Sequence, residues 1–348
     1  MLSHINIIYI IWILLFFFTC LISFFLVNRH LVNYSSPNVQ KNVVRIVMFL
    51  PLNSGLSILS SIFPGIAIFN SLVRNCYMAF TAHCFFSMMT NSIGEKNMLD
   101  LFESQGKMKF LCCKVMKLNR KLFNTLRFGS IQFFIVKIFC SIATITCISI
   151  SEEVHSILNV QSFAPYEFLI SLVASIFCTI SLSIFLAISK EKLSQYWPMT
   201  KYRIMIFIFF IEQFEYLFFA LIFLRGPFFL GFKNSFDQTI FILHFTVVVT
   251  MFLFSIVYLF IYSYKNYRNK ASNEPLVGRN FKDSFGLLNY LDVLNPKDLF
   301  IDFASIFKTN NNKFKELVEE NGDKKPKKNI EDQNQENSND QPLSIQMA

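Results

Sequence analysis

The stretch from Ile7 to Val27, IIYIIWILLFFFTCLISFFLV, decides the fold class. It contains no Asp, Glu, Lys or Arg. An α-helix needs about 20 predominantly apolar residues to cross the hydrocarbon core of a bilayer. No Lys or Arg precedes it and no small-residue cleavage site follows it, so we interpret it as a spanning helix and not as a signal peptide. The stretch predicts a helical membrane protein.

Further stretches of similar length and apolarity follow along the chain. They are Val44–Pro64, Leu72–Asn91, Phe128–Ile150, Tyr166–Ile188, Ile204–Leu224 and Gln238–Tyr262. Only 16% of the 348 residues are charged, against roughly 25% in soluble domains. The short Pro64-Gly65 link predicts a tight hairpin between the second and third helices. The expected fold class is therefore an all-α membrane protein with seven transmembrane helices.

The basic residues predict the orientation of these helices. Lys and Arg cluster in the loops after the first, third and fifth stretches and again after the seventh, but are absent from residues 1–6 and from Ser151–Pro165. Cytoplasmic loops carry the excess of Lys and Arg in membrane proteins. We therefore expect the N-terminus outside and the C-terminus in the cytosol, in the plasma membrane or an endomembrane. The same pattern accounts for the net charge of +9 without a nucleic-acid partner.

The chain divides by composition into four regions. Residues 1–6 are expected to be extracellular, 7–262 to form the transmembrane domain, and 263–308 to be a cytosolic juxtamembrane segment. Within that segment, DLFIDFASIF (Asp298–Phe307) predicts a short amphipathic helix on the inner leaflet. Residues 309–348 are rich in Asn, Lys, Glu, Asp and Gln, which predicts a disordered tail.

Two carboxylates lie inside the sixth stretch, where FFIEQFEYLFF contains Glu212 and Glu215. A charge at such depth costs roughly 2.5–3.5 kcal/mol on insertion scales, so it usually faces the bundle interior, a partner or water. Lys137 in the fourth stretch is the expected partner of one of them. The pattern is compatible with a polar patch on a transport path and equally with a structural ion pair between helices.

Other polar side chains extend this predicted transport path or intramembrane polar network. Its expected members are Asn53, His83, Gln132, Lys137, Glu212, Gln213 and Glu215. For His83 or Asn53 alone, as for Asn91 and His244, a hydrogen bond between helices is the favoured interpretation. Arg74, near the outer end of the third stretch, suits an interfacial anchor at least as well as a contact to anionic solutes.

Enzyme chemistry finds no support in the sequence. There is no P-loop, HExxH or GxSxG motif, and the eight Cys show no metal-ligand spacing. We expect no enzyme activity, no cofactor and no metal. Cys112 and Cys113, in FLCCKVMKL, are juxtamembrane residues flanked by apolar and basic neighbours. They are candidates for S-palmitoylation, with unmodified thiols as the alternative.

Seven helices with this topology first suggest a G-protein-coupled receptor. The third stretch, however, ends in MMTNSIGEKN without a DRY-like triplet, and the seventh ends in SIVYLFIYSYK without NPxxY. Divergent chemosensory receptors also lose these motifs, so a receptor of this kind stays as the alternative.

Four stretches together resemble the organic solute transporter subunit alpha family. They are RIVMFLPLNSGLSILSSIFP (Arg45–Pro64), IAIFNSLVRNCYMAF (Ile66–Phe80), Cys112-Cys113 followed by FGSIQFFIVKI (Phe128–Ile138), and LNPKDLFIDFASIF (Leu294–Phe307). In the third, Gly129, Gln132 and Lys137 match the family's Gly-x-x-Gln and basic residue. The two-residue cysteine patch is shorter than in the family's best-known members, and Glu212 and Glu215 match no family motif.

The resemblance implies facilitated transport of amphipathic organic anions, such as steroid conjugates or bile-acid-like molecules, without ATP or sodium. It further implies a small single-pass beta-type subunit as partner, besides membrane lipids, and acylation of Cys112 and Cys113. Whether the chain also forms a homo-oligomer stays open.

Overall fold

The computed structural model describes residues 2–110, 114–150, 163–223 and 235–267, together with 292, 293 and 295. The chain divides into two units, residues 1–296 and 297–348, and every described residue belongs to the first. Cys112, Cys113, the expected amphipathic helix and the expected disordered tail lie outside the described residues.

A long helix covers each of the apolar stretches. Most of these helices begin before the stretch or end after it. They are α1 (Leu2–Val32), α2 (Pro37–Ile62), α3 (Ala67–Ile93), α5 (Arg120–Ile150), α6 (Ala164–Ser189), α7 (Pro198–Phe223) and α8 (Ser235–Ile261). The shortest have 26 residues, which at about 1.5 Å per residue gives about 39 Å. Each is longer than the roughly 30 Å hydrocarbon core of a bilayer.

Five of these helices are also apolar enough to be candidate membrane spans, namely α1, α2, α5, α6 and α8. The other two long helices carry buried charge, with Arg74 on α3 and both Glu212 and Glu215 on α7. Such side chains lower the hydropathy of a helix without shortening it. The structure thus confirms a predominantly helical chain, in which five helices are long and apolar enough to cross a membrane.

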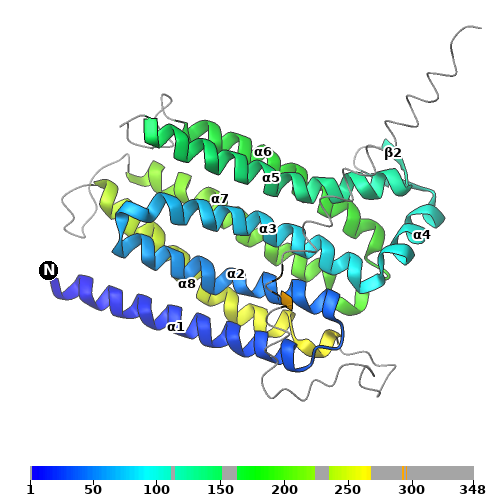
Figure 1. The fold of residues 1–348 in the computed structure, drawn as a ribbon, viewed down its shortest axis with the longest axis horizontal. Coiled ribbons are helices and arrows are strands. Elements are labelled where there is room, and N and C mark those ends of the chain that lie inside the picture. Colours follow the sequence, from blue (N-terminus) through cyan, green and yellow to red (C-terminus); the bar gives the residue numbers. More distant parts are fainter. Residues whose placement is uncertain are drawn as a thin grey trace, which may run out of the picture. The chain divides into compact units, whose positions relative to one another are not determined.

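The long helices run alternately in opposite directions, as Figure 1 shows. One end of the bundle, called here the N-terminal end, holds the start of α1 and the link between α2 and α3. That link is the 3₁₀ turn η1 (Pro64–Ile66), and α2 and α3 pack along their length, so the predicted helical hairpin is confirmed. The other principal packing partners are α5 with α6, α2 with α8, α1 with α2, α3 with α5, and α1 with α8.

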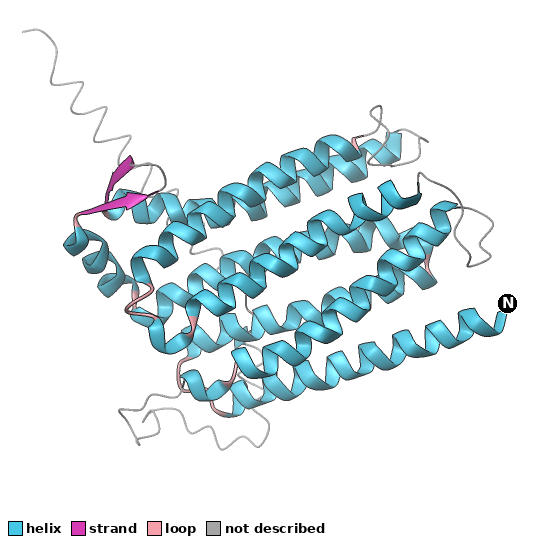
Figure 2. Cartoon of the chain, turned by 180° about the vertical axis from the view of Figure 1, so that it is seen from behind, coloured by secondary structure: helices cyan, strands magenta, loops and turns pink. Residues whose placement is uncertain are grey.

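The opposite end, called here the basic end, carries short elements that the apolar pattern does not predict. They are the helix α4 (Glu95–Gln105), an antiparallel hairpin of β1 (Lys107–Phe110) and β2 (Lys114–Lys117), and the 3₁₀ turns η2 (Ser194–Tyr196) and η3 (Tyr264–Tyr267). Figure 2 shows the hairpin next to α4. Its strands pair Lys107 with Lys117. Such short strands lack the length that makes alternation recognisable in a sequence.

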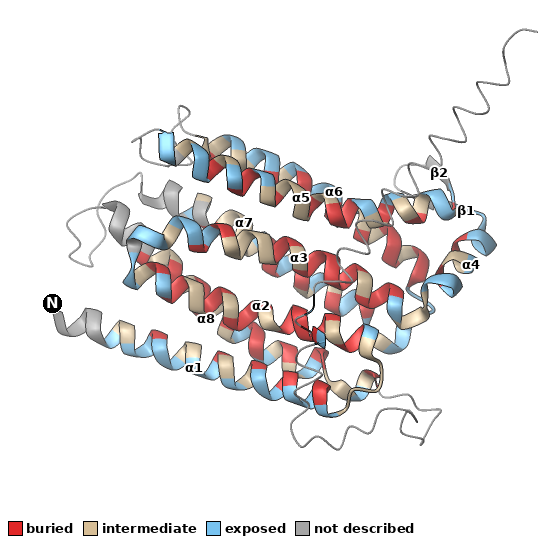
Figure 3. Cartoon of the chain, in the orientation of Figure 1, coloured by how far each residue is buried: buried red, intermediate tan, exposed pale blue. Residues whose placement is uncertain are grey.

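Burial separates an inner from an outer surface of the bundle (Figure 3). The side of α1 that faces away from the other helices exposes large apolar side chains, and Phe17 is 54% exposed. On α6, Phe177 is 59% exposed. Exposed apolar side chains along whole helices suit contact with lipid tails, which are as apolar as the side chains themselves.

The segment beyond α8 contacts the bundle at its basic end. Arg45 of α2 donates from Nε to the carbonyl of Val293 over 3.0 Å and from Nη2 to the carbonyl of Asn295 over 2.7 Å. Tyr34 donates to the Asp292 carboxylate over 2.9 Å. Arg45, which the sequence pattern assigns to the edge of a basic loop, is therefore buried inside α2 and anchors the chain beyond the last long helix.

Candidate functional site

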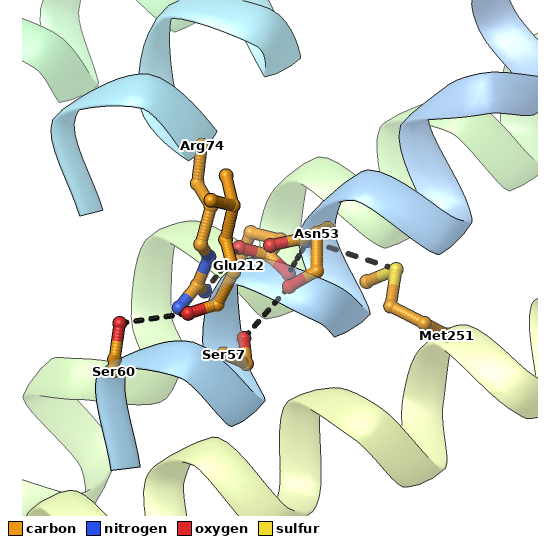
Figure 4. A network of polar contacts seen from close by, with 7 residues as sticks. Asn53, Ser57, Ser60, Arg74, Glu212 and Met251 are labelled. Carbon is orange, nitrogen blue, oxygen red and sulfur yellow. Dashed lines mark hydrogen bonds and ion pairs between the residues drawn. The ribbon is translucent and has the colours of Figure 1, made fainter. Parts of the chain in front are cut away.

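A buried ion pair joins α3 to α7 inside the bundle. The Nη2 of Arg74 lies 3.0 Å from Oε2 of Glu212, and the two side chains are only 11% and 6% exposed. Water therefore screens this pair little, and each charge depends on the other for compensation. Figure 4 shows the pair together with the polar side chains around it.

Asn53 of α2 completes the contact on the other side of Glu212. Its amide Nδ2 donates to Oε1 of Glu212 and also contacts the sulfur of Met251 on α8 at 3.6 Å. Ser57, one turn further along α2, donates to the Asn53 carbonyl over 2.9 Å. Residues from α2, α3, α7 and α8 thus meet at one point, which we call the polar cluster.

The polar cluster lies well inside the bundle. At about 1.5 Å per residue, Arg74 is about 10 Å along the axis from the first residue of α3. Glu212 is likewise about 16 Å from Phe223, the last residue of α7. Both helix ends are at the N-terminal end of the bundle. A charge buried at that distance from the helix end needs a partner inside the bundle.

Four buried atoms, two on residues of the polar cluster and two on the neighbouring Glu215 and His244, have no hydrogen-bond partner within the described part of the chain. They are Oδ1 of Asn53, Nε of Arg74, Oε1 of Glu215 and Nδ1 of His244. Glu215 is one turn from Glu212 on α7 and interacts electrostatically with it. Arg74 is the charged side chain that interacts electrostatically with His244 of α8. Buried polar atoms are nearly always paired. Each of these four atoms therefore has capacity for a hydrogen bond to water or to a polar ligand.

Lys137 is not the partner of Glu212, contrary to the expectation from the sequence, because Arg74 occupies that position. Lys137 is buried on α5. Its strongest electrostatic interaction with a carboxylate is with Glu167 of α6, and its interaction with Glu212 is weaker. Glu167 in turn accepts a hydrogen bond from Thr144 over 2.7 Å. Two cations and three carboxylates thus share one electrostatic network.

The remaining predicted network residues lie outside the polar cluster. His83 of α3 contacts the Ser130 hydroxyl of α5 at 3.3 Å, and Gln132 of α5 donates to the Ala174 carbonyl of α6 over 3.1 Å. Both are hydrogen bonds between helices. Gln213 is half-buried next to Glu212 on α7.

Sequence reasoning placed Arg74 at the membrane surface and left it out of the network. A charge within an apolar stretch was visible in the sequence, since Arg74 lies two residues into the third apolar stretch. In the structure it lies about two turns inside α3. Hydropathy alone could not show that the helix begins earlier, at Ala67. His244 was recognised as an intramembrane polar group, yet its proximity to Arg74 depends on how α8 packs.

Lys201 is a further buried cation, and it lies at the basic end. Lys201 of α7 precedes the apolar stretch that begins at Ile204, and it donates from Nζ to the Tyr267 hydroxyl over 2.6 Å. Its ammonium group lies over the rings of Tyr262 and Tyr267, at 5.2 and 4.7 Å from their centroids. Burial lowers the pKa of Lys201 to about 7. The Lys201 ammonium group therefore loses its proton more readily than that of an exposed lysine. Its contact with Tyr267 connects η3 to α7.

Among the described residues, no group of three or more His, Cys, Asp or Glu side chains could hold a metal ion.

Comparison with known proteins gives one family and several distant relatives. The model of the family described as organic solute transporter Ostalpha matches residues 8–267. The chain is 23% identical over 303 residues to Protein LAZ1 of Arabidopsis thaliana, covering 80% of this chain and 61% of that protein. It is 23% identical over 331 residues to a transmembrane protein 184 homolog of Dictyostelium discoideum, covering 84% and 65%.

Protein LAZ1 homolog 2 of Arabidopsis thaliana is 28% identical over 144 residues, 35% of this chain and 36% of that protein. The chain therefore spans less than two thirds of the length of these relatives. No solved structure matches. These matches do not favour a G-protein-coupled receptor. Because the family model covers most of the helical bundle, including every residue of the polar cluster, the chain belongs to the organic solute transporter Ostalpha family.

Proposed function

We propose that this protein carries amphipathic organic anions, such as steroid conjugates or bile-acid-like molecules, across a membrane through the polar cluster. Membership of the family supports a solute-transporter-like role. The observation that carries the choice of an anion is Arg74, whose guanidinium is buried inside the bundle while its Nε has no partner among the described residues. Arginine is the side chain best suited to bind carboxylate or sulfate, because its donors form a planar fork.

A purely structural ion pair is the competing explanation for Arg74 and Glu212. A structural pair in a low-dielectric interior is stable only if the remaining donors and acceptors around it are also satisfied. Here Oδ1 of Asn53 and Nε of Arg74, both on residues that contact Glu212, lack partners within the described residues. That surplus of polar atoms is what a solute site needs and what a structural pair avoids.

The proposed membrane arrangement has seven crossings, with the N-terminus outside and the C-terminus in the cytosol. The proposed membrane is the plasma membrane. The seven long helices are all long enough to cross, and α3 and α7 keep their charges on the inside of the bundle. The basic segments around α4, the hairpin and η2 gather at one end of the bundle, which the positive-inside rule assigns to the cytosol.

A single-pass beta-type subunit and acylation of Cys112 and Cys113 are further parts of the proposal, and both come from the family resemblance. Acylation is tested by acyl exchange on the expressed protein. The wild type should be labelled, whereas a variant with Cys112→Ser and Cys113→Ser should not be. Equal labelling of the two would place any acyl group elsewhere.

Uptake of a labelled steroid sulfate tests the transport function directly. Cells express the chain with and without a candidate single-pass partner, and uptake is normalised to protein at the cell surface. Arg74→Gln together with Glu212→Gln removes the ion pair without leaving a lone charge. We expect at least about tenfold lower uptake, because one charge-assisted hydrogen bond is worth about 1.5–3 kcal/mol.

Arg127→Gln together with Glu95→Gln is the matched control, since this pair lies at the basic end with Glu95 55% exposed. Its uptake should equal that of the wild type. Uptake at background level for the wild type with every partner would refute the proposed function. Equal losses in the two double variants would remove the polar cluster from the transport path.

A further inference from the structure

Lys201 is a buried cation whose contacts include no carboxylate. It is 1% exposed, and no Asp or Glu among the described residues forms an ion pair with it. Its Nζ donates to the Tyr267 hydroxyl over 2.6 Å and lies 4.7 and 5.2 Å from the ring centroids of Tyr267 and Tyr262. One neutral hydroxyl and two aromatic rings therefore stand in for the counter-ion that a buried ammonium group usually has.

Two helices bring the same face to the polar cluster and to Lys201. On α7, Lys201 and Glu212 lie about three turns apart, so they share a face of the helix. Tyr262 and Met251, the neighbour of Asn53, have the same spacing along α8 and the turn that continues it. The polar cluster and Lys201 are thus about 16 Å apart along the interior of one bundle.

The side chains between these two positions are apolar. Met205 and Ile208 of α7 and Tyr258 of α8 are each 1% exposed and belong to the main hydrophobic core. Methionine is unbranched and adapts its shape to what packs against it. A cation at either end, Arg74 and Lys201, with apolar side chains in between matches the two parts of an amphipathic anion.

Tyr267 covers Lys201 at the basic end. This tyrosine is 3% exposed, and its hydroxyl accepts from Lys201 and donates to the sulfur of Met88 on α3 over 3.7 Å. Its ring stacks on that of Tyr196 in η2 with 5.8 Å between centroids, and its carbonyl accepts from the Ser35 hydroxyl over 3.1 Å. One residue of η3 thus joins α3, α7, η2 and the link between α1 and α2. Water and solutes reach Lys201 from this end only if Tyr267 moves.

An anion is a better partner for Lys201 than the Tyr267 hydroxyl. A hydrogen bond between two ionised groups is shorter and stronger than one to a neutral hydroxyl. The ring of Tyr262, which contacts Lys201, also carries a buried hydroxyl without a partner in the described part of the chain. That hydroxyl is a second donor for an anion at Lys201.

We propose that Lys201 is a second binding site for the anionic group of the solute, and that the Tyr267 hydroxyl occupies this site and closes the basic end until the anion replaces it; the inference rests on the proposed transport function. The ammonium group of Lys201 then donates to the anion, and Tyr267 moves away with η3. When the anion leaves, the hydroxyl returns to Lys201. The exchange is reversible, so the net flux follows the gradient of the solute alone.

Uptake of a labelled steroid sulfate, normalised to protein at the cell surface, tests the proposal through variants of the two partners of one hydrogen bond. Lys201→Gln removes the charge and should lower uptake at least about tenfold, the value of one hydrogen bond to a charged group. Lys201→Arg keeps the charge and should retain most of the uptake. Tyr267→Phe keeps the ring and removes the competing hydroxyl, so uptake should rise by up to about tenfold. Lys190→Gln, at an exposed lysine that follows α6, is the control and should leave uptake unchanged.

Opposite changes in Lys201→Gln and Tyr267→Phe are the signature of the proposal. A fall in both variants would mean that the hydrogen bond only supports the fold, and a rise in both would mean that Lys201 holds Tyr267 without binding the anion. Either result would overturn the second anion site and leave the transport function intact. Uptake at background level in the wild type with every partner would overturn the transport function and this inference with it.

A spectroscopic measurement keeps both Lys201 and the Tyr267 hydroxyl in place. The solubilised protein carries 3-fluorotyrosine at position 267, and its fluorine resonance is followed by NMR as steroid sulfate is added. The resonance should move from that of a buried to that of an exposed tyrosine, whereas the same steroid without its sulfate group should leave it unchanged. No movement at saturating steroid sulfate would contradict the displacement of Tyr267, and equal movement with both steroids would contradict the role of the anionic group.

Discussion

Removing one half of the Arg74–Glu212 pair is expected to destabilise the protein strongly. The two atoms lie 3.0 Å apart, and the side chains are 11% and 6% exposed, so little water can solvate whichever charge is left. Breaking a buried pair in this way costs about 3–5 kcal/mol. Arg74→Gln and Glu212→Gln should each lower the free energy of unfolding by that amount.

The double variant separates the interaction energy of this pair from the other effects of each substitution. With both charges removed, no lone charge remains, so the loss should be clearly smaller than the sum of the two single losses. We expect a coupling energy above about 2 kcal/mol from the complete mutant cycle. The same cycle at Arg127 and Glu95, which lie 3.2 Å apart with Glu95 55% exposed, should give no more than about 1 kcal/mol.

The assay is reversible unfolding of the purified protein in mixed micelles, followed by circular dichroism as the denaturing detergent is increased. The four proteins of each cycle are measured in one lipid and detergent mixture. A coupling energy at Arg74 and Glu212 no larger than at the exposed control pair would refute the reasoning. It would mean that water reaches the polar cluster and screens its charges.

Three other perturbations test separate parts of the structure. Gly129→Ala would place Cβ 2.0 Å from Oγ and 2.7 Å from Cβ of Ser181; we expect a loss of about 1–3 kcal/mol from overpacking, restored by adding Ser181→Gly, in the same unfolding assay. Burial lowers the pKa of Lys201 from 10.5 to about 7. Between these two pH values the unfolded chain binds more protons, so stability should rise with pH by up to about 1.4 kcal/mol per unit, and thermal unfolding of Lys201→Met should lack this rise. Arg45→Gln loses charged donors to the carbonyls of Val293 and Asn295, so limited proteolysis with mass spectrometry should show faster cleavage at this segment, and unchanged cleavage would refute the anchoring.

The helices were largely predictable because their signals are local. An apolar run such as Ile7–Val27 records where a helix passes through lipid, and the structure places α1 over Leu2–Val32. The extra turns at each end lie where polar residues are tolerated, so an apolarity scan does not detect them. The hairpin of β1 and β2 escaped prediction because two four-residue strands carry too little pattern.

The polar cluster was only half predictable. Glu212 and Glu215 stand out as charges in an apolar segment, and Asn53 was recognised as an intramembrane amide. The expectation that Lys137 pairs with Glu212 or Glu215 was wrong for Glu212, because Lys137 and Arg74 are both basic and the sequence does not show which helix faces α7. Packing brings the Arg74 guanidinium to Glu212 and leaves Lys137 nearer to Glu167.

Composition and segment length are enough to identify this chain as a multi-pass helical membrane protein, because the transfer of apolar side chains into lipid depends on little else. Which charges meet depends instead on how the helices pack, since compensation of a buried charge requires short distances between helices that are far apart in the chain. Asn53, Arg74 and Glu212 come from three different helices, and their contact exists only once those helices have packed.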